Sequence, residues 1–293
     1  MPELPDVVVY CEALATRLRG QVLERVRLAN PFVLRTAEPP IAEAGGKRVL
    51  DVRRLGKRIV LALEGDLFLV VHLMIAGRLR WLKADAKPPA RITLAIFEFA
   101  TGRLALTEAG TKRRASLHLV RGEIALTQFD MGGLEVEGST PEAFAARLTR
   151  ENHTLKRALT DPRLFSGIGN AYSDEILHRA RLSPLTLTQK LTPDKIARLQ
   201  GAARNVVREW IDRLRDEAGG GFPEKVTAFR PEMAVHGRFG QPCPVCRAPV
   251  RRIVYAENEA NYCARCQTHG VVLADRALSR LLHKSFPRTL DDV

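Results

Sequence analysis

The sequence predicts an α+β protein of more than one domain, and three features carry this prediction. Short apolar runs joined by tight turns occupy residues 22–127. A helical pattern begins at Thr140 and includes a long segment from Thr192 to Glu217. Four cysteines gather between Cys243 and Cys266, where we expect a separate small unit. The length agrees, because 293 residues are enough for about two domains.

The first residues predict a helix that is followed by β-structure. Pro5 suits a first helical turn and Gly20 suits a stop, so we expect a helix over residues 5–19. The segments RIVLALEGDLFLVVHLMIAGRLRWL and RITLAIFEFATGRLALTEAG then predict strands that turn at Glu64-Gly65-Asp66 and at Thr101-Gly102. A β-sandwich or barrel with one flanking helix is the expected result.

The second half of the chain predicts helices. Residues 130–140 have the composition of a linker, and the hydroxyl of Thr140 can cap the segment TPEAFAARLTR. ENHTLKRALTD and NAYSDEILHRARLS predict a helix pair, separated by the turn Gly167-Ile168-Gly169-Asn170. Glycines let the backbone approach a phosphate closely, and the N–H groups of the following helix can bind it. An ordinary tight turn is the alternative, but Lys156 and Arg157 on the preceding helix favour phosphate binding.

The charge balance favours a polyanionic partner. Lys plus Arg number 46 against 33 for Asp plus Glu, which gives a net charge of +13 and a pI near 10.0. Nucleic acid is favoured over an acidic membrane because no basic amphipathic stretch stands apart. No apolar run approaches the ~18 residues that a membrane span requires. The start lacks the layout of a secretory signal, so we expect a cytoplasmic protein with no membrane partner.

The four late cysteines predict one structural zinc ion. Cys243-Pro-Val-Cys246 and Cys263-Ala-Arg-Cys266 are two CxxC pairs with sixteen residues between them, enough for a β-hairpin that returns to the same point. Four thiolates suit tetrahedral Zn²⁺ and leave no open position for chemistry. Reduced core cysteines would not explain the paired spacing. Several arginines near this hairpin can face phosphates: Arg247, Arg251, Arg252 and Arg265.

Taken together, these motifs resemble one family. The chain is similar to the Fpg/Nei family of DNA glycosylases (formamidopyrimidine-DNA glycosylase and endonuclease VIII) in six segments. These are MPELPD, RRLGKRIVLAL with Lys57, HLMIAGRL, LKRALTDPRLFSGIGNAYSDEIL, and the closing VHGRFGQPCPVC and NYCARCQ. The resemblance extends from Pro2 to Gln267. It implies an N-terminal β-sandwich, a helical domain of the helix–two-turn–helix type and a zinc-finger β-hairpin.

The resemblance divides the chain into named parts. Residues 1–130 are expected to form the catalytic β-sandwich domain, and 131–140 the linker. The helix–two-turn–helix DNA-binding domain is expected over 141–235 and the four-cysteine zinc finger over 236–270. Residues 271–293 form a C-terminal extension, in which ADRALSRLLHKSF predicts one more helix with leucines facing inward: Leu278, Leu281 and Leu282.

The resemblance also gives the opening residues a chemical role. Removal of Met1 leaves Pro2 with a free secondary amine, and an α-amino group titrates near ~8, so part of it is neutral at pH 7. A neutral amine can attack C1′ of a damaged nucleoside and form an iminium that serves both base loss and strand cleavage. Glu3 can protonate the sugar ring oxygen. The family match assigns these roles to Pro2 and Glu3.

Other positions match the DNA contacts of the family. Lys57 is implied to contact the phosphate beside the lesion and to assist the elimination. Lys156 and Asn170, with the glycines of the turn at Gly167 and Gly169, are implied to contact phosphates. Glu175 is expected to brace that glycine turn, with a place near the active site as the alternative.

The sequence departs from the family at two kinds of DNA contact. One kind binds the phosphates at the lesion, and the other fills the space that the flipped base leaves in the duplex. Asn258 stands where the zinc finger usually has an arginine that holds the lesion phosphates, so Arg252 or Arg265 would have to substitute. Of the side chains that fill the hole left by the flipped base, Arg113 is present. Ile75, preceded by Met74, stands in place of a methionine, and Ala115 stands in place of a phenylalanine. This thinner wedge favours bases that are easy to extrude, in single strands, bubbles, or bulky or cross-linked damage.

The prediction is a monomeric DNA glycosylase with AP-lyase activity that acts on damaged double-stranded or partly unpaired DNA. The loop GGGFPEKVTAFRPEM is shorter than the base-capping loop of Fpg enzymes, so the sequence does not identify the preferred damaged base. It also does not decide whether the strand is cleaved by β- or by β,δ-elimination. One alternative is a non-catalytic protein of this fold that binds damaged DNA, which Pro2 and Glu3 oppose. A zinc-ribbon RNA-binding protein is a second alternative, but it leaves the first residues unexplained.

Overall fold

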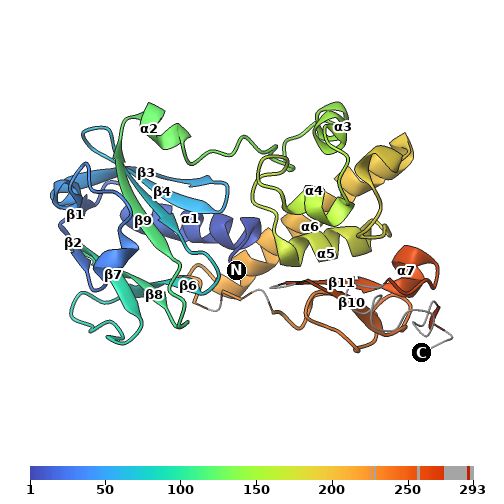
Figure 1. Ribbon diagram of the computed structural model, residues 1–293. Helices are drawn as coiled ribbons and strands as arrows, with labels where there is room; N and C mark the ends of the chain where they lie inside the picture. The colour runs from blue at the N-terminus through green and yellow to red at the C-terminus, as the bar shows by residue number, and fades with distance from the viewer. Residues whose placement is uncertain (225, 228, 256–257, 274–288, 291–293) are drawn as a thin grey trace. The chain divides into compact units, whose positions relative to one another are not determined.

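The computed structural model describes residues 1–293 except 225, 228, 256–257, 274–288 and 291–293 (Figure 1). The predicted tail helix with Leu278, Leu281 and Leu282 lies outside the described residues. The chain forms two compact units, which we call unit 1 (Met1–Met131 and Trp210–Thr227) and unit 2 (Gly132–Glu209 and Ala228–Val293). The domain boundaries given above stay a prediction.

Unit 1 begins with helix α1, Leu4–Leu18, one residue from its predicted bounds at each end. Pro5 lies in the first turn, as its fixed φ and missing N–H allow. Glu3 caps the helix in a reciprocal arrangement with Asp6. The Glu3 carboxylate accepts the Asp6 N–H, and the Glu3 N–H donates to Asp6 Oδ2 at 2.9 Å. The cap fixes the direction in which the first residues enter the helix.

Two antiparallel sheets follow α1. The first has the order β1-β3-β4-β5-β9, with β1 at Val22–Leu23, β3 at Lys47–Leu55, β4 at Arg58–Leu63, β5 at Leu67–His72 and β9 at Ser116–Arg121. The second has the order β2-β7-β8-β6, with β2 at Arg25–Leu28, β7 at Thr93–Phe99, β8 at Gly102–Glu108 and β6 at Gly77–Leu82. Short helices complete this segment: η1 at Pro31–Val33, η2 at Ile41–Ala44 and α2 at Glu123–Thr127.

One core lies between the two sheets and confirms the predicted β-sandwich with a flanking helix. Leu14 of α1, Leu61 of β4 and Phe97 of β7 belong to the same buried cluster. The two predicted turns join β4 to β5 and β7 to β8. A glycine is required at Gly102, because a Cβ there would lie 2.7 Å from the Leu82 carbonyl oxygen and from the Trp81 ring.

Unit 2 is helical, as predicted. Its elements are α3 at Pro141–Thr149, α4 at Leu155–Thr160, α5 at Asn170–Arg179, η3 at Thr188–Lys190 and most of α6 at Pro193–Ala218, whose last turns belong to unit 1. Thr140 caps α3 by accepting the Ala143 N–H at 3.2 Å, which confirms the predicted start. The rings of Phe144 and Phe165 pack in the core with centroids 4.8 Å apart.

The four-cysteine segment of unit 2 forms the predicted hairpin. Strand β10, Val250–Val254, pairs antiparallel with β11, Glu259–Cys263, and α7 follows at Ala264–Thr268 (Figure 1). The hairpin places Val250 opposite Cys263, so the chain returns to the first cysteine pair. Within the described parts of the chain, no helix has the length and apolar character needed to cross a membrane.

Candidate functional site

The N-terminal residues lie in a buried, charged environment within unit 1. Pro2 is buried, and Glu3 is only 2% exposed. Burial lowers the pKa of the Met1 amino group below its ordinary value, and the cations Arg78 and Lys57 act in the same direction while Glu3 opposes them. The structure therefore places Glu3 and Lys57 close enough to the beginning of the chain to act on its amino group. In this setting the Met1 amino group is biased toward its neutral form.

Lys57 follows Gly56 in the tight turn between β3 and β4, where Gly56 has a φ of +59°. The next residue, Arg58, lies opposite His72 across the β4–β5 ladder. Burial lowers the pKa of His72 to about 4, with Arg58 and Lys57 as further causes. His72 was not among the predicted site residues, although HLM belongs to one of the motifs of the resemblance. No local signal marked it, because its place opposite Arg58 depends on the pairing of β4 with β5.

Ile75, Arg113 and Ala115, the positions compared with the side chains that fill the hole left by a flipped base, differ in their exposure. Ile75 is 55% exposed in the connection between β5 and β6. Arg113 is exposed, and its guanidinium donates to the Arg91 carbonyl at 2.8 Å. Ala115 is only 2% exposed and belongs to the core of the sandwich, where its N–H donates to Glu108 Oε2 at 3.0 Å. The backbone at Ala115 is therefore held inward by a buried carboxylate.

The glycine turn of unit 2 leads directly into α5. Gly167 has a φ of +76°, which a residue with a side chain adopts only with strain, and Gly169 is the N-cap of α5. Lys156 lies beside this turn, as predicted, but it is only 8% exposed. Its Nζ is 2.7 Å from the Asn170 carbonyl oxygen and 2.5 Å from Asp174 Oδ1. The Lys156 ammonium therefore holds the first turn of α5 in place.

Glu175 braces a different segment from the predicted one. Its carboxylate accepts the N–H groups of Ala234, Val235 and His236 at 2.8, 2.9 and 3.0 Å, so the expectation that it braces the glycine turn was wrong. Burial raises the pKa of Glu175 above its ordinary value, although these three N–H groups favour the ionised form. Sequence spacing could not show this, because the partners lie about 60 residues further along the chain.

Asn258 lies exposed at the tip of the β10–β11 hairpin, and its carbonyl accepts the Tyr255 N–H at 2.7 Å. Of the two suggested substitutes, Arg252 lies on the same hairpin. Its guanidinium carbon is 4.3 Å from the centre of the Phe239 ring, and its Nη1 is 3.2 Å from Glu259 Oε2. The Glu259 carbonyl in turn accepts the Asn170 side chain at 3.0 Å. Arg252 and Asn170 are thus connected through Glu259.

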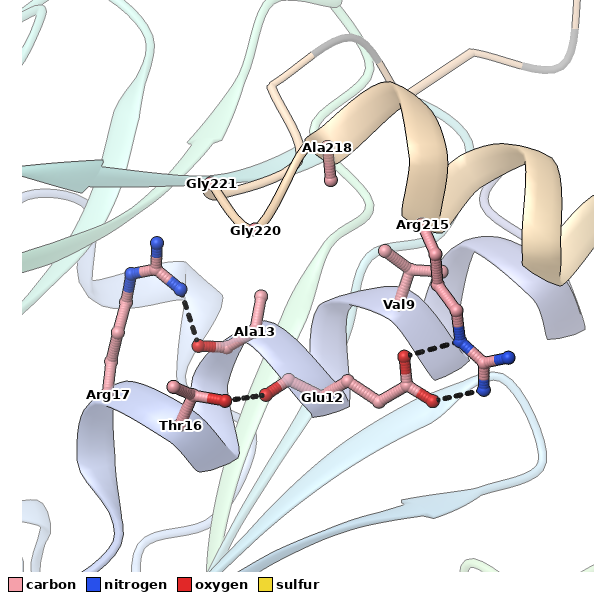
Figure 2. A pocket seen from close by; sticks show the side chains of 9 residues that line it. All are labelled: Val9, Glu12, Ala13, Thr16, Arg17, Arg215, Ala218, Gly220 and Gly221. Carbon is pink, nitrogen blue, oxygen red and sulfur yellow. Dashed lines mark hydrogen bonds and ion pairs between the residues drawn. The ribbon is translucent and has the colours of Figure 1, made fainter.

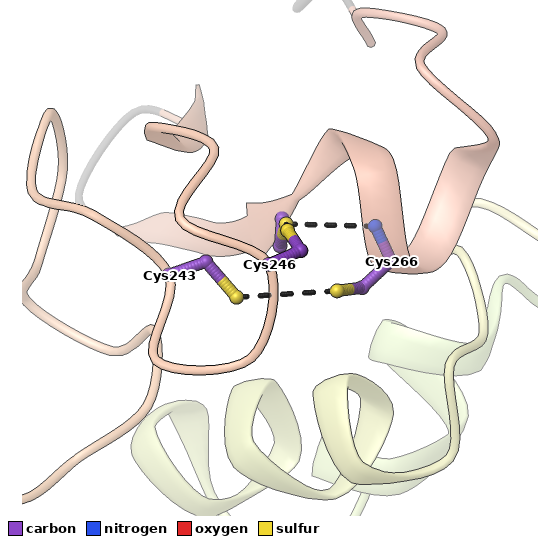
Figure 3. Close-up of side chains that lie close together, drawn as sticks. Cys243, Cys246 and Cys266 are labelled. Carbon is purple, nitrogen blue, oxygen red and sulfur yellow. Dashed lines mark hydrogen bonds between the residues drawn. The ribbon is translucent and has the colours of Figure 1, made fainter.

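The four cysteines have the geometry of a metal site. Figure 3 shows three of them, Cys243, Cys246 and Cys266. The four Sγ atoms all lie within 4.8 Å of one another, with Cys243 and Cys266 3.9 Å apart and Cys246 and Cys263 3.4 Å apart. Tetrahedral zinc with Zn–S bonds of about 2.3 Å requires sulfur separations of roughly 3.8 Å, so the residues fit the ion. The four thiolates hold one structural zinc ion, which links the loop before β10 to the start of α7.

Unit 1 also contains a cavity of about 180 Å³ between α1 and the end of α6 (Figure 2). Arg215 of α6 donates two hydrogen bonds to the Glu12 carboxylate of α1, at 2.6 and 2.9 Å. Arg17 and the backbone at Gly220 and Gly221 line the same cavity. None of the residues predicted for the site lies here. The ion pair joins the last turns of α6 to the β-sandwich unit.

Comparison with known proteins identifies three consecutive domains. Residues 1–117 match the formamidopyrimidine-DNA glycosylase N-terminal domain, and residues 134–218 match the formamidopyrimidine-DNA glycosylase H2TH domain. Residues 240–268 match a zinc finger found in FPG and IleRS, which confirms the zinc prediction together with the cysteine geometry. The three matches follow the order that the sequence motifs indicated.

Curated relatives match along almost the whole chain. The formamidopyrimidine-DNA glycosylase of Thermus thermophilus is 35% identical over 286 residues, which cover 92% of this chain and 100% of the relative. The one of Heliobacterium modesticaldum is 33% identical over 279 residues, which cover 91% of this chain and 100% of the relative.

Solved structures show the same fold. The crystal structure of the MutM (Fpg) protein from Thermus thermophilus is 33% identical with a TM-score of 0.76, covering 91% of this chain and 98% of its own. The Lactococcus lactis Fpg in complex with DNA that contains an oxidised pyrimidine is 25% identical with a TM-score of 0.81, covering 91% of this chain and 100% of its own.

Proposed function

The chain belongs to the formamidopyrimidine-DNA glycosylase family, and from this premise we propose that it removes a damaged base from DNA and then cleaves the abasic strand through the amine of Pro2. It is a zinc-finger DNA glycosylase of base excision repair. Its partner is damaged DNA, whether double-stranded or partly unpaired. We propose that the enzyme is a monomer and acts in the bacterial cytoplasm, where it would meet its DNA substrate.

The observation that carries the mechanism is the buried setting of the N-terminal residues beside Glu3 and Lys57. After Met1 is removed, the Pro2 nitrogen attacks C1′ of the damaged nucleoside. The new N–C1′ bond forms as the bond to the base breaks, and the base leaves with that electron pair and a proton. Glu3 protonates the ring oxygen, which opens the sugar and leaves an iminium. Lys57 neutralises the neighbouring phosphate.

Strand cleavage follows from the same iminium. This cation draws electrons from the C2′–H bond, so a base removes the C2′ proton and the 3′ phosphate leaves with its bonding electrons. Hydrolysis of the iminium then releases Pro2 for the next cycle. Neutral Pro2 is essential for the first step, and the lowered pKa of an amine at this place supports it.

Unit 2 supplies the proposed phosphate-binding surface. The N–H groups at the start of α5, after Gly167 and Gly169, suit an anion. Asn170 and Asn258 add neutral donors from α5 and from the hairpin tip. We assign Lys156 a part in this surface through its bond to the Asn170 carbonyl, which fixes the first turn of α5. In unit 1, Arg113 is proposed to enter the duplex.

Borohydride trapping tests the mechanism directly. Incubation with abasic-site DNA and borohydride should give a covalent protein–DNA product, because the reagent reduces the iminium to a stable amine. Pro2→Gly should weaken the trapping at least tenfold, and Glu3→Gln should retain DNA binding but lose base excision. Lys112→Gln, at an exposed position, is the control. Wild-type protein that binds damaged DNA and yields no adduct would instead establish the non-catalytic alternative.

We further propose that the enzyme prefers damaged bases that are already poorly stacked. Ala115 lies in the core, so Ile75 and Arg113 remain to fill the hole left by a flipped base. Unstacking costs a few kcal/mol, and it costs least for a base that is already unpaired. Excision of an oxidised base from a bubble should therefore be at least tenfold faster than from an intact duplex of the same sequence. Equal single-turnover rates in the two contexts would contradict this preference.

A further inference from the structure

His178 lies next to the zinc site without belonging to its four ligands. It is in the last turns of α5, is only 6% exposed, and places Nε2 3.3 Å from Cys243 Sγ. Among the described residues, the set of donor atoms close enough to share one ion contains only the four cysteines. Cys243 is itself fully buried, at 0% exposure. The contact between His178 and Cys243 is therefore shielded from water.

The chemistry of the site fixes the direction of this hydrogen bond. A cysteine sulfur that is bound to zinc is a thiolate and has no proton to donate. Nε2 of His178 must then carry the proton and act as the donor. We propose that His178 is a built-in partner of the zinc site, whose Nε2–H stabilises the buried Cys243 thiolate and holds its sulfur in place as a zinc ligand. Hydrogen bonds to metal-bound ligands tune their reactivity and the affinity of the site for its metal.

The rest of α5 holds the imidazole in position. Asn170, Asp174 and His178 are spaced by four residues and therefore share one face of the helix. Each contacts a segment that flanks or contains the cysteines. Asn170 donates to the Glu259 carbonyl at 3.0 Å, and Asp174 Oδ2 is 2.8 Å from His236 Nδ1. His178 is thus the third residue on this face of α5 that contacts the region of the cysteines. Because the helix already holds its ring in position, the ring does not have to be ordered when zinc binds.

The effect is measured as the hold of the site on its metal. Zinc leaves when its bonds to the cysteine sulfurs break and a chelator takes their place. A donated hydrogen bond that keeps the Cys243 sulfur in position favours the bound ion. Loss of the bond should therefore be visible as faster transfer of zinc to a chelator.

The test compares three variants of the full chain in the absence of DNA. His178→Phe removes the donor and keeps a ring of similar size, His178→Gln keeps an N–H donor on a flexible side chain, and His153→Phe removes a histidine whose Nε2 contacts Glu151 instead. Zinc transfer to an excess of a metallochromic chelator is followed by its absorbance. We expect about tenfold faster release for His178→Phe, partial recovery for His178→Gln and an unchanged rate for His153→Phe. Equal rates for wild type and His178→Phe would overturn the proposal.

A spectroscopic readout separates a hydrogen bond from simple packing. In the cobalt-substituted protein, loss of a donor raises the energy of the sulfur lone pair, so the sulfur-to-cobalt charge-transfer band of His178→Phe should shift to longer wavelength. His178→Gln should shift less. If His178→Phe does not fold, the wild-type protein loaded with ¹¹³Cd decides the question by NMR. Coupling between the His178 Nε2 proton and ¹¹³Cd supports the proposal, and an imidazole protonated only at Nδ1 refutes it.

Discussion

Burial shifts the pKa values of single groups in this protein, and neighbouring charges shift them further. Glu3 combines a structural and a proposed chemical role, because its carboxylate accepts the Asp6 N–H while it lies beside the beginning of the chain. The resemblance pointed to Pro2, Glu3 and Lys57. It could not point to His72, which comes to lie opposite Arg58 only when β4 and β5 pair. Contacts of this kind depend on strand register, which a motif does not encode.

The lowered pKa of His72 makes part of the stability depend on pH. In the folded protein His72 binds a proton only near pH 4, whereas in the unfolded chain it does so below its ordinary value of 6.5. Between these values the unfolded state binds more protons, so the free energy of unfolding should fall as the pH is lowered from 6.5 to about 4 and then level off. The loss attributable to His72 is at most roughly 3 kcal/mol.

Urea denaturation at pH 7 and pH 5 of the wild type and of His72→Gln checks this prediction. The wild type should lose more stability between the two pH values than the variant. The pKa of His118 is lowered by burial as well, so the difference between the two proteins isolates His72. Identical pH dependence of the two would show that His72 does not contribute.

At the level of secondary structure, α5 connects three parts of unit 2. Its N-terminus lies at the glycine turn, its middle holds residues 234–236 through Glu175, and its last turns reach Cys243. Sequence patterns predicted the helix, the turn and the hairpin, since each depends on local spacing and capping. They could not predict which distant segment α5 would hold, and this is why the role given to Glu175 was wrong.

Removal of the Glu175 carboxylate should destabilise unit 2. Glu175→Ala leaves the N–H groups of Ala234, Val235 and His236 without the acceptor that they share, and buried donors without a partner cost about 1–3 kcal/mol each. We expect a loss of at least roughly 3 kcal/mol in the free energy of unfolding, measured by urea denaturation with zinc present. Glu142→Ala, at an exposed position of α3, should change it by less than about 0.5 kcal/mol. A similar small loss for both variants would contradict the brace.

For the molecule as a whole, the sequence predicted the architecture well. The sandwich, the helical part and the zinc hairpin follow from apolar periodicity and cysteine spacing. The last turns of α6 pack with the β-sandwich through Arg215 and Glu12, residues 203 positions apart. A helix pattern alone cannot show that one end belongs to another unit. The net charge of +13 is in keeping with a protein whose proposed partner is a polyanion.

The identity of the residue that bonds to the sugar is the most direct test of the proposed chemistry. The borohydride-trapped complex can be digested, and the peptide that carries the deoxyribose remnant can be sequenced by tandem mass spectrometry. We predict that the modified peptide begins at Pro2, without Met1, and that the added mass is on the Pro2 nitrogen. A modified peptide that retains Met1, or one in which the remnant is attached to Lys57 or another lysine, would contradict the mechanism.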